Sequence, residues 1–306
     1  MKIKEFIDRH ERVKVIWEAL QKNSDEQFRK RVLGTDCLNI SVMENTNIDR
    51  KTGKSGILYQ IEMGTWGDGF FAEYKKLLNY LYFADFFQWK PCVHFSNQFT
   101  YAEDHPINGT ENPFEYFFEP IVKMDDANEY RYYVNSREVD WEFANRLKPV
   151  NGYDISEEYI QAMSEINQKY IKFNDITLRY LQSTDDLLGK NKVLGVHVRL
   201  TDFKQNFLGH PVCITAEEHL KYAVDAVKKY GFNKIFLATD DVSTVDLFRK
   251  EFGKNLLYYE DVTRSSGDVS VAFSDNVREN HHYKLALEVI RDMYTLSRCN
   301  GLIAGK

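Results

Sequence analysis

The sequence has few cysteines, no long apolar run and no excess of basic residues, and each absence excludes a class of protein. Its four cysteines are widely separated and form no C-x-x-C pair, which predicts reduced, mostly buried thiols. No apolar run reaches the roughly 18 residues of a transmembrane helix, and the first residues lack the apolar core of a signal peptide. A net charge of -6 argues against a nucleic-acid partner. We therefore expect a cytoplasmic protein, with peripheral association at the inner face of the membrane left open.

Motifs of metal and dinucleotide chemistry are also missing. There is no G-x-G-x-x-G fingerprint, so a dinucleotide-dependent dehydrogenase has little support. His281 and His282 are adjacent, and on a helix they would point about 100° apart, which prevents them from sharing a metal. Asp240 and Asp241 lack the intervening residue of a metal-binding D-x-D motif, and tandem aspartates after a strand are often turn formers. The sequence predicts no metal site and no cofactor.

The carboxyl half alternates apolar runs with amphipathic segments. Strands are predicted at four runs, residues 193–198, 234–241, 255–260 and 301–304. Helices are predicted at 215–231, 243–252 and 276–298. Thr215 and Glu218 have the form of a capping box at the start of the first helix, and Gly231 ends it. Strands that alternate with helices predict a parallel, doubly wound sheet.

The first of these strands ends in chemically active side chains. Arg199, Thr201 and Asp202 stand where the apolar run stops, and His197 lies inside it. Ligands of open α/β sheets bind just beyond the carboxyl ends of strands, and a guanidinium there can grip a phosphate with two hydrogen bonds. The alternative interpretation is an ordinary strand end with a solvated arginine.

These residues resemble motifs of a known family. His197-Val198-Arg199-x-Thr201-Asp202, then Leu237 to Asp241, then Asp292 with Leu296-Ser297, are similar to the donor domain of α-1,6-fucosyltransferases, including bacterial nodulation fucosyltransferases. That group is related to the α-1,2- and protein O-fucosyltransferases. Upstream, Gly64 to Phe70 resembles the glycine loop in the amino domain of the same enzymes.

The resemblance implies a fold and a reaction. The expected fold is α/β and GT-B-like, with two Rossmann-like domains facing a central cleft. Residues 1–185 would form the acceptor-side domain, with the glycine loop near 64–70, and residues 186–306 would bind the GDP-sugar. The implied enzyme is an inverting, metal-independent glycosyltransferase that moves L-fucose from GDP-β-L-fucose to a hydroxyl of an oligosaccharide or glycolipid, in bacterial cell-surface polysaccharide synthesis. A GT-B enzyme with another GDP-sugar donor and a non-catalytic nucleotide- or glycan-binding protein remain alternatives.

The resemblance also implies roles for individual residues in donor binding. His197 would lie beside the guanine, and the carboxylate of Asp292 would accept hydrogen bonds from the N1–H and N2 amino group of that base. The pyrophosphate would lie near Arg199 and the glycine loop. The full set of expected donor-binding residues is His197, Arg199, Lys204, Asp240, Asp241, Asp292, Gly67, Asp68 and Gly69. For Asp292 the alternative is a structural ion pair with Arg291 or Arg298.

The sequence departs from the family pattern at three points. Leu200 stands where the family has a second arginine, and Lys204 is a candidate replacement. Residues 205–210 hold no carboxylate for the expected catalytic base, so Asp202 is the first choice and His210 the second. A serine-containing loop is expected after the last strand, but the sequence ends first, so either the protein is naturally short or its carboxyl end is truncated.

Aromatic residues are abundant, with 19 Tyr and 21 Phe, and many lie in the amino half. The first interpretation is packing in the core and between domains. The alternative is a carbohydrate acceptor cleft, in which ring faces stack on sugars. A polar, glycine-containing stretch at 183–191, after a helix predicted at 156–181, indicates the domain boundary.

Overall fold

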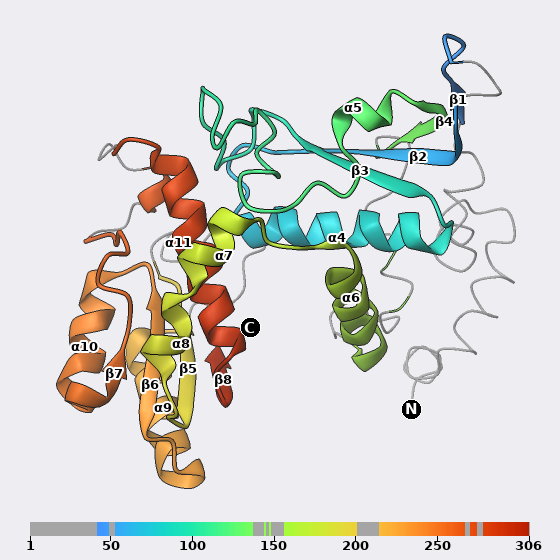
Figure 1. The fold of residues 1–306 in the computed structure, drawn as a ribbon. Coiled ribbons are helices and arrows are strands. Elements are labelled where there is room, and N and C mark those ends of the chain that lie inside the picture. Colours follow the sequence, from blue (N-terminus) through green and yellow to red (C-terminus); the bar gives the residue numbers. More distant parts are fainter. Residues whose placement is uncertain are drawn as a thin grey trace, which may run out of the picture. The chain divides into compact units, whose positions relative to one another are not determined.

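The computed structural model describes residues 42–48, 53–136, 144, 147, 156–200, 214–266, 270–273 and 278–305. The chain divides into two compact units (Figure 1). Unit 1 comprises Met1–Thr100 and Asn108–Phe173, and unit 2 comprises Tyr101–Ile107 and Asn174–Lys306. Where the sequence predicts a boundary between 185 and 186, the division falls at 173/174.

Unit 1 is built on a four-stranded sheet in the order β1-β4-β2-β3. The strands are β1 (Met43–Glu44), β2 (Lys54–Met63), β3 (Lys90–Phe95) and β4 (Tyr130–Asn135). Both neighbours of β2, β3 and β4, are parallel to it, and β1 pairs antiparallel with β4. Parallel pairing requires a crossover, and the helix between β2 and β3 provides it.

Helix α4 (Phe70–Phe86) packs aromatic side chains against this sheet. The described part of unit 1 also contains α5 (Met124–Ala127) and α6 (Glu157–Tyr170), and α6 packs against α4. Tyr59 of β2 and Phe83 of α4 are fully buried, with ring centroids 5.4 Å apart. The rings of Phe114, Tyr116 and Phe117 are also buried. For these five residues, the packing interpretation of the aromatic content is confirmed.

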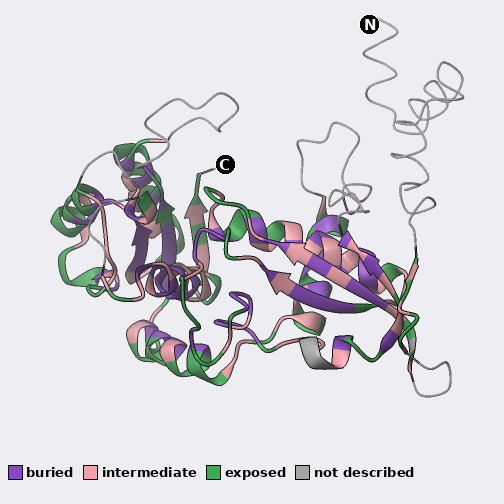
Figure 2. Cartoon of the chain, turned by 90° about the horizontal axis from the view of Figure 1, so that it is seen from above, coloured by how far each residue is buried: buried purple, intermediate pink, exposed green. Residues whose placement is uncertain are grey.

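Unit 2 contains a parallel sheet in the order β7-β6-β5-β8, as the alternating pattern predicts. Its elements, in chain order, are α7 (Asp175–Leu181), α8 (Ser183–Leu188), β5 (Val193–Val198), α9 (Ala216–Tyr230), β6 (Lys234–Thr239), α10 (Val242–Phe252), η5 (Gly253–Asn255), β7 (Leu256–Leu257), η6 (Val271–Phe273), α11 (His281–Ser297) and β8 (Gly301–Ala304). Figure 2 shows that buried residues concentrate on the central strands.

Helices cover this sheet and fix its edges. Val196 and Leu237 pack with Phe248 of α10 and Ala223 of α9 in one core cluster. On α11, Leu296 approaches so closely that a Cβ on Gly195 would lie 3.0 Å from its side chain. Glycine at this position therefore allows the helix to lie directly on the strand, and α11 is held in a fixed place relative to the strand ends.

Three predicted elements differ from the structure. The helix predicted at 156–181 is interrupted, because Ile171 is extended, Phe173 forms a bridge with Phe118, and Asn174 caps a new helix. The strand predicted at 255–260 has only two residues. The last helix begins at His281, after a residue of positive φ, rather than at 276.

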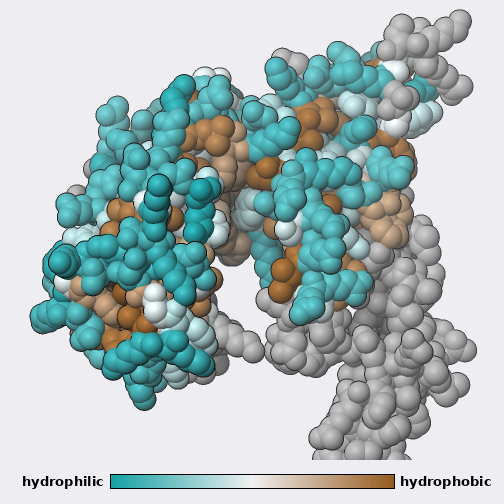
Figure 3. Space-filling view, turned by 60° about the horizontal axis from the view of Figure 1, so that its bottom comes forward, coloured by the Kyte–Doolittle hydropathy of each residue, from teal (hydrophilic) through white to brown (hydrophobic). Residues whose placement is uncertain are grey.

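One face of the molecule is mainly polar. On the face shown in Figure 3, hydrophilic side chains cover most of the surface and hydrophobic residues show through in separate areas. Within the described part of the chain, no helix combines the length and apolarity that crossing a membrane would require. Burial raises the pKa of the Cys92 thiol and of the Cys299 thiol to about 11.

Candidate functional site

The carboxyl edge of the unit 2 sheet brings two predicted donor-binding residues together. Val198 of β5 pairs with Thr239 of β6, so Arg199 and Asp240 follow neighbouring strand ends. The backbone N–H of Leu200 donates a hydrogen bond to Oδ1 of Asp240 over 3.1 Å. This bond holds the chain at the point where the exposed Arg199 leaves the sheet. Asp240 therefore fixes the backbone next to Arg199.

His197 lies one residue inside the same edge. Its backbone pairs with Ala238 on one side and Ala304 on the other, and solvent reaches its ring. The pKa of His197 lies below its ordinary value, first because surrounding protein displaces part of its water and then because of the positive charge of Arg199. The imidazole is therefore neutral near pH 7 and offers one donor and one acceptor nitrogen.

Asp241 serves as a helix cap. Its Oδ2 accepts hydrogen bonds from the backbone N–H of Thr244 at 2.7 Å and from the Thr244 hydroxyl at 2.9 Å. The hydroxyl of Ser243 donates to the same oxygen. Asp241 is buried at the amino end of α10, where its negative charge is also favourable to the helix dipole. Asp241 therefore has a local capping role, in line with the interpretation of tandem aspartates as turn-forming residues.

Asp292 lies on α11 beside an arginine that the sequence analysis did not select. The Oδ1 atom of Asp292 is shielded from solvent and has no hydrogen-bond partner. The Nε and Nη2 atoms of Arg264, a residue that follows β7, are also shielded from solvent and have no hydrogen-bond partner. Each of the two side chains is the strongest electrostatic partner of the other, although no direct hydrogen bond joins them. A carboxylate and a guanidinium thus lie near each other with unused hydrogen-bonding capacity.

Backbone contacts attach Arg264 to the strand ends. The N–H of Ser265 donates to the carbonyl of Asp240 at 2.8 Å, and the N–H of Val242 donates to the carbonyl of Ser265 at 3.0 Å. The segment that carries Arg264 is therefore fixed beside the residue that positions Arg199. Arg199 and the Arg264–Asp292 pair therefore belong to one region of unit 2.

Burial changes the acidity of Asp292. Its pKa is raised to about 7, chiefly by desolvation, while the positive charges of Arg264 and Arg291 oppose the shift. Near neutral pH the carboxyl group is therefore close to its titration midpoint. Hydrogen-bond donors from a ligand would favour its ionised form.

The arginines expected in the structural alternative have other partners. Arg291 donates to Asp261 at 2.6 Å, and its guanidinium lies 3.8 Å from the ring centroid of Tyr259. Arg298 pairs with Asp185 at 2.8 Å. Neither Arg291 nor Arg298 forms a direct ion pair with Asp292. The described side chains therefore do not form the structural ion pair of the alternative interpretation.

A second buried carboxylate extends the cluster on α11. Glu288 is one helical turn before Asp292 and accepts a hydrogen bond from Arg278 at 2.6 Å and from the N–H of Thr263 at 3.4 Å. The Nε and Nη2 atoms of Arg278 have no hydrogen-bond partner. Sequence reasoning missed Arg264, Arg278 and Glu288, because the only signal was a set of isolated charges in and around a helix. Their proximity depends on how the segment after β7 folds.

The glycine loop lies in unit 1, between β2 and α4. Gly67 has φ +90°, a conformation that favours glycine, and its N–H donates to the Thr100 hydroxyl at 2.9 Å. Asp68 accepts from Lys76 at 2.6 Å, and Gly69 is the N-cap residue of α4. The predicted placement of this loop against the pyrophosphate stays a prediction.

Three predicted residues, Asp202, Lys204 and His210, lie outside the described residues. Their expected roles as catalytic base and phosphate ligand stay predictions. Leu200, which replaces a family arginine, is buried in the core cluster of unit 2. Among the side chains that the structure describes, no group of three or more His, Cys, Asp or Glu residues could hold a metal ion.

Comparisons with known proteins find similarity to fucosyltransferases. No protein-family model and no curated protein matches the chain. A structure of NodZ α-1,6-fucosyltransferase soaked with GDP-fucose is similar at 15% identity and a TM-score of 0.45, covering 82% of this chain and 88% of that chain. Fucosyltransferase NodZ from Bradyrhizobium gives 14% identity, a TM-score of 0.46 and coverage of 81% and 88%. POFUT1 in complex with GDP-fucose gives 12% identity, a TM-score of 0.35 and coverage of 84% and 99%.

At these identities and TM-scores, the function of the chain has to be argued from its own residues.

Proposed function

We propose that the chain is a glycosyltransferase that transfers L-fucose from GDP-β-L-fucose to a hydroxyl of a glycan acceptor, with inversion at the anomeric carbon. Unit 2 would bind the nucleotide. The motifs at Arg199, Asp240 and Asp292 support this assignment by their resemblance to fucosyltransferases, and the side chains around them support it by their chemistry.

One observation carries the proposal, the unpartnered polar atoms of Asp292 and Arg264. Leaving buried polar atoms without partners costs free energy, and a ligand that pairs with them recovers it. Guanine presents the N1–H and N2 amino donors beside the O6 and N7 acceptors along one continuous edge. A carboxylate complements the donors, and a guanidinium is the common partner of O6 and N7. Uracil and adenine lack this combination, so the pair would select a guanine nucleotide.

The position of Arg199 supports a role at the diphosphate. It leaves the carboxyl edge of a parallel sheet, which is where ligands of open α/β sheets bind. As the bond to fucose breaks, negative charge grows on the β-phosphate, and a guanidinium directed there stabilises the transition state more than the ground state. Neutral His197 would lie beside the base and supply a hydrogen bond without adding repulsion to Arg199.

The transfer itself would be a single displacement. The acceptor hydroxyl attacks the anomeric carbon from the face opposite the nucleotide while a base removes its proton. We propose Asp202 for this base and His210 as the second choice. Arg199 and Lys204 would carry the leaving-group charge, so the reaction would need no metal.

Burial of Leu200 favours one competing function. A second arginine at that position would add charge to the phosphate site, and the core location of Leu200 removes that contribution. A protein that binds a guanine nucleotide without catalysing transfer is therefore the alternative. An enzyme with another GDP-sugar would share the guanine site and differ in the sugar pocket.

Turnover separates these functions. Purified protein is incubated with GDP-fucose or GDP-mannose and a panel of oligosaccharides, with and without EDTA, and GDP release and product mass are measured. We expect fucosylated product, unaffected by EDTA, and loss of product in the Arg199→Ala variant. Preference for GDP-mannose would establish the second donor class, and GDP binding without any turnover would establish the non-catalytic function.

A further inference from the structure

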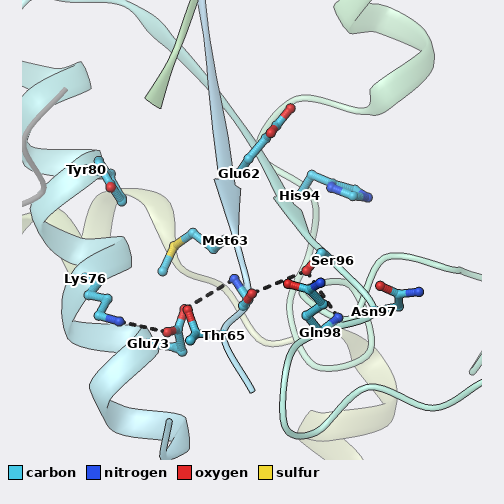
Figure 4. A pocket seen from close by; sticks show the side chains of 11 residues that line it. Glu62, Met63, Thr65, Glu73, Lys76, Tyr80, His94, Ser96, Asn97 and Gln98 are labelled. Atoms are coloured by element: carbon cyan, nitrogen blue, oxygen red, sulfur yellow. Dashed lines mark hydrogen bonds and ion pairs between the residues drawn. The ribbon is translucent and has the colours of Figure 1, made fainter. Parts of the chain in front are cut away.

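A polar pocket in unit 1 lies at the carboxyl ends of two parallel strands. It has a volume of about 630 Å³, and residues between Glu62 and Gln98 line it (Figure 4). The strands β2 and β3 end side by side at Met63 and Phe95, and α4 begins just after the loop that follows β2. Ligands of parallel sheets bind beyond such strand ends, and the volume is within the range of small-molecule sites.

One side of the pocket is rigidly built. The N–H of Gly64 donates to Glu73 at 3.3 Å, and Lys76 donates to the other oxygen of Glu73 at 3.0 Å. Gly64 has φ +112°, and a Cβ there would lie 2.9 Å from the hydroxyl of Ser96, so only glycine lets the two strand ends approach this closely. The N–H of Ser96 also donates to the carbonyl of Met63 at 2.8 Å. These contacts fix the end of β2 before any ligand arrives.

The charged side chains of the described lining disfavour an anionic ligand. Lys76 is the one lysine or arginine among the described lining residues, and it already bridges Glu73 and Asp68. A phosphate or carboxylate ligand would therefore have to compete with these two carboxylates for the same cation, which disfavours its binding.

The remaining side chains suit a neutral polyol. Glu62 and His94 are register partners on β2 and β3, so their side chains lie on the same face of the sheet, and Figure 4 shows them next to each other. Asn97 and Gln98 offer amide donors and acceptors from the exposed rim. Carboxylates accept hydrogen bonds from hydroxyls, and an amide can both donate to and accept from neighbouring hydroxyls, which is the pattern of a sugar ring.

We propose that the part of this pocket formed by Glu62, His94, Asn97 and Gln98 binds a neutral sugar residue of the acceptor glycan. The inference rests on the proposed function, because it assigns the acceptor side of that reaction. It assigns a role in acceptor recognition to side chains of unit 1 that lie outside the glycine loop at Gly64 to Phe70.

Direct binding tests the pocket without requiring turnover. Saturation-transfer NMR is recorded for the methyl glycosides of galactose, glucose and N-acetylglucosamine against the full chain, its Gln98→Ala and His94→Ala variants, and the exposed control Gln168→Ala on α6. We expect a saturation-transfer signal for at least one glycoside, weakened about tenfold in affinity by each pocket variant and unchanged in the control. Inorganic phosphate should not compete.

The outcomes distinguish this inference from the proposed function. Glycoside binding that is equal in wild type and both pocket variants would overturn the pocket assignment, and so would competition by phosphate. Titration of GDP into the same proteins is the second measurement. If GDP binds but the pocket variants do not change glycoside binding, the nucleotide site stands and only the acceptor-site proposal is wrong. If GDP does not bind, the proposed function itself is contradicted.

Discussion

The two units hold buried charges in opposite ways. In unit 1, Lys76 donates to both Asp68 and Glu73, and Glu73 also accepts from the N–H of Gly64, so the network is internally satisfied. In unit 2, Arg264 and Asp292 lie near each other with unpartnered atoms on both. A satisfied network supports a loop, whereas an unsatisfied one has capacity reserved for a ligand. The difference separates a structural ion cluster from a candidate recognition site.

The largest expected effect concerns Arg199. The Arg199→Ala variant should lower turnover by a factor on the order of 10²–10³, because one preorganised donor to the leaving phosphate is lost. Arg199→Lys keeps the positive charge but loses the planar guanidinium that can donate two parallel hydrogen bonds, so it should recover only part of the activity. GDP affinity should fall less than turnover does.

Steady-state kinetics with GDP-fucose check this prediction. The exposed Arg179 on α7 provides a matched control, and Arg179→Ala should retain full activity. Near wild-type turnover of Arg199→Ala would show that the motif is structural in this protein.

A second prediction compares the two charge networks through stability. Lys76→Met leaves Asp68 and Glu73 close together without their shared cation, and the free energy of unfolding should fall by about 1–3 kcal/mol. Arg264→Met should cost less, because two of its nitrogens have no partner to lose and Asp292 can take up a proton.

Urea denaturation of both variants measures the difference, with Lys75→Met as the control for an exposed lysine on the same helix. An equal or larger loss in Arg264→Met would mean that the unit 2 cluster is as structural as the one in unit 1.

A third prediction concerns the pH dependence of stability. The pKa of Asp292 is raised from 3.8 to about 7 in the folded chain, so the unfolded state loses this proton first as the pH rises. The free energy of unfolding should therefore decline from about pH 4 to about pH 7 because of this group. In Asp292→Asn that contribution is absent, so the variant should gain stability relative to wild type across this interval. Thermal melts of the two proteins at several pH values measure the gain, and parallel curves would contradict the assigned ionisation.

The sequence predicted most of unit 2 and much less of its site. Alternating apolar and amphipathic runs gave the parallel sheet, and Thr215 with Glu218 forms the predicted capping box. The break at Ile171 was missed, because a bridge between Phe118 and Phe173 decides it and no local pattern shows such a contact. Asp292 was selected through its resemblance to a family motif, whereas no sequence pattern pointed to Arg264.

The unit 1 pocket could likewise not be predicted from the sequence. The glycine loop was visible as a motif, but the pairing of Glu62 with His94 follows from the register of β2 and β3. Strand register depends on how whole strands pack, and a single sequence does not specify it.

The central claim is that Asp292 and Arg264 read the guanine edge, and isothermal titration of nucleotide diphosphates tests it most directly. Wild type should bind GDP best, IDP about tenfold more weakly because it lacks the 2-amino group, and 7-deaza-GDP more weakly because it lacks N7. UDP and ADP should bind weakest. Asp292→Asn should remove the preference for GDP over IDP, and Arg264→Gln the preference for GDP over 7-deaza-GDP. Equal affinity of the wild type for UDP and GDP would contradict the account.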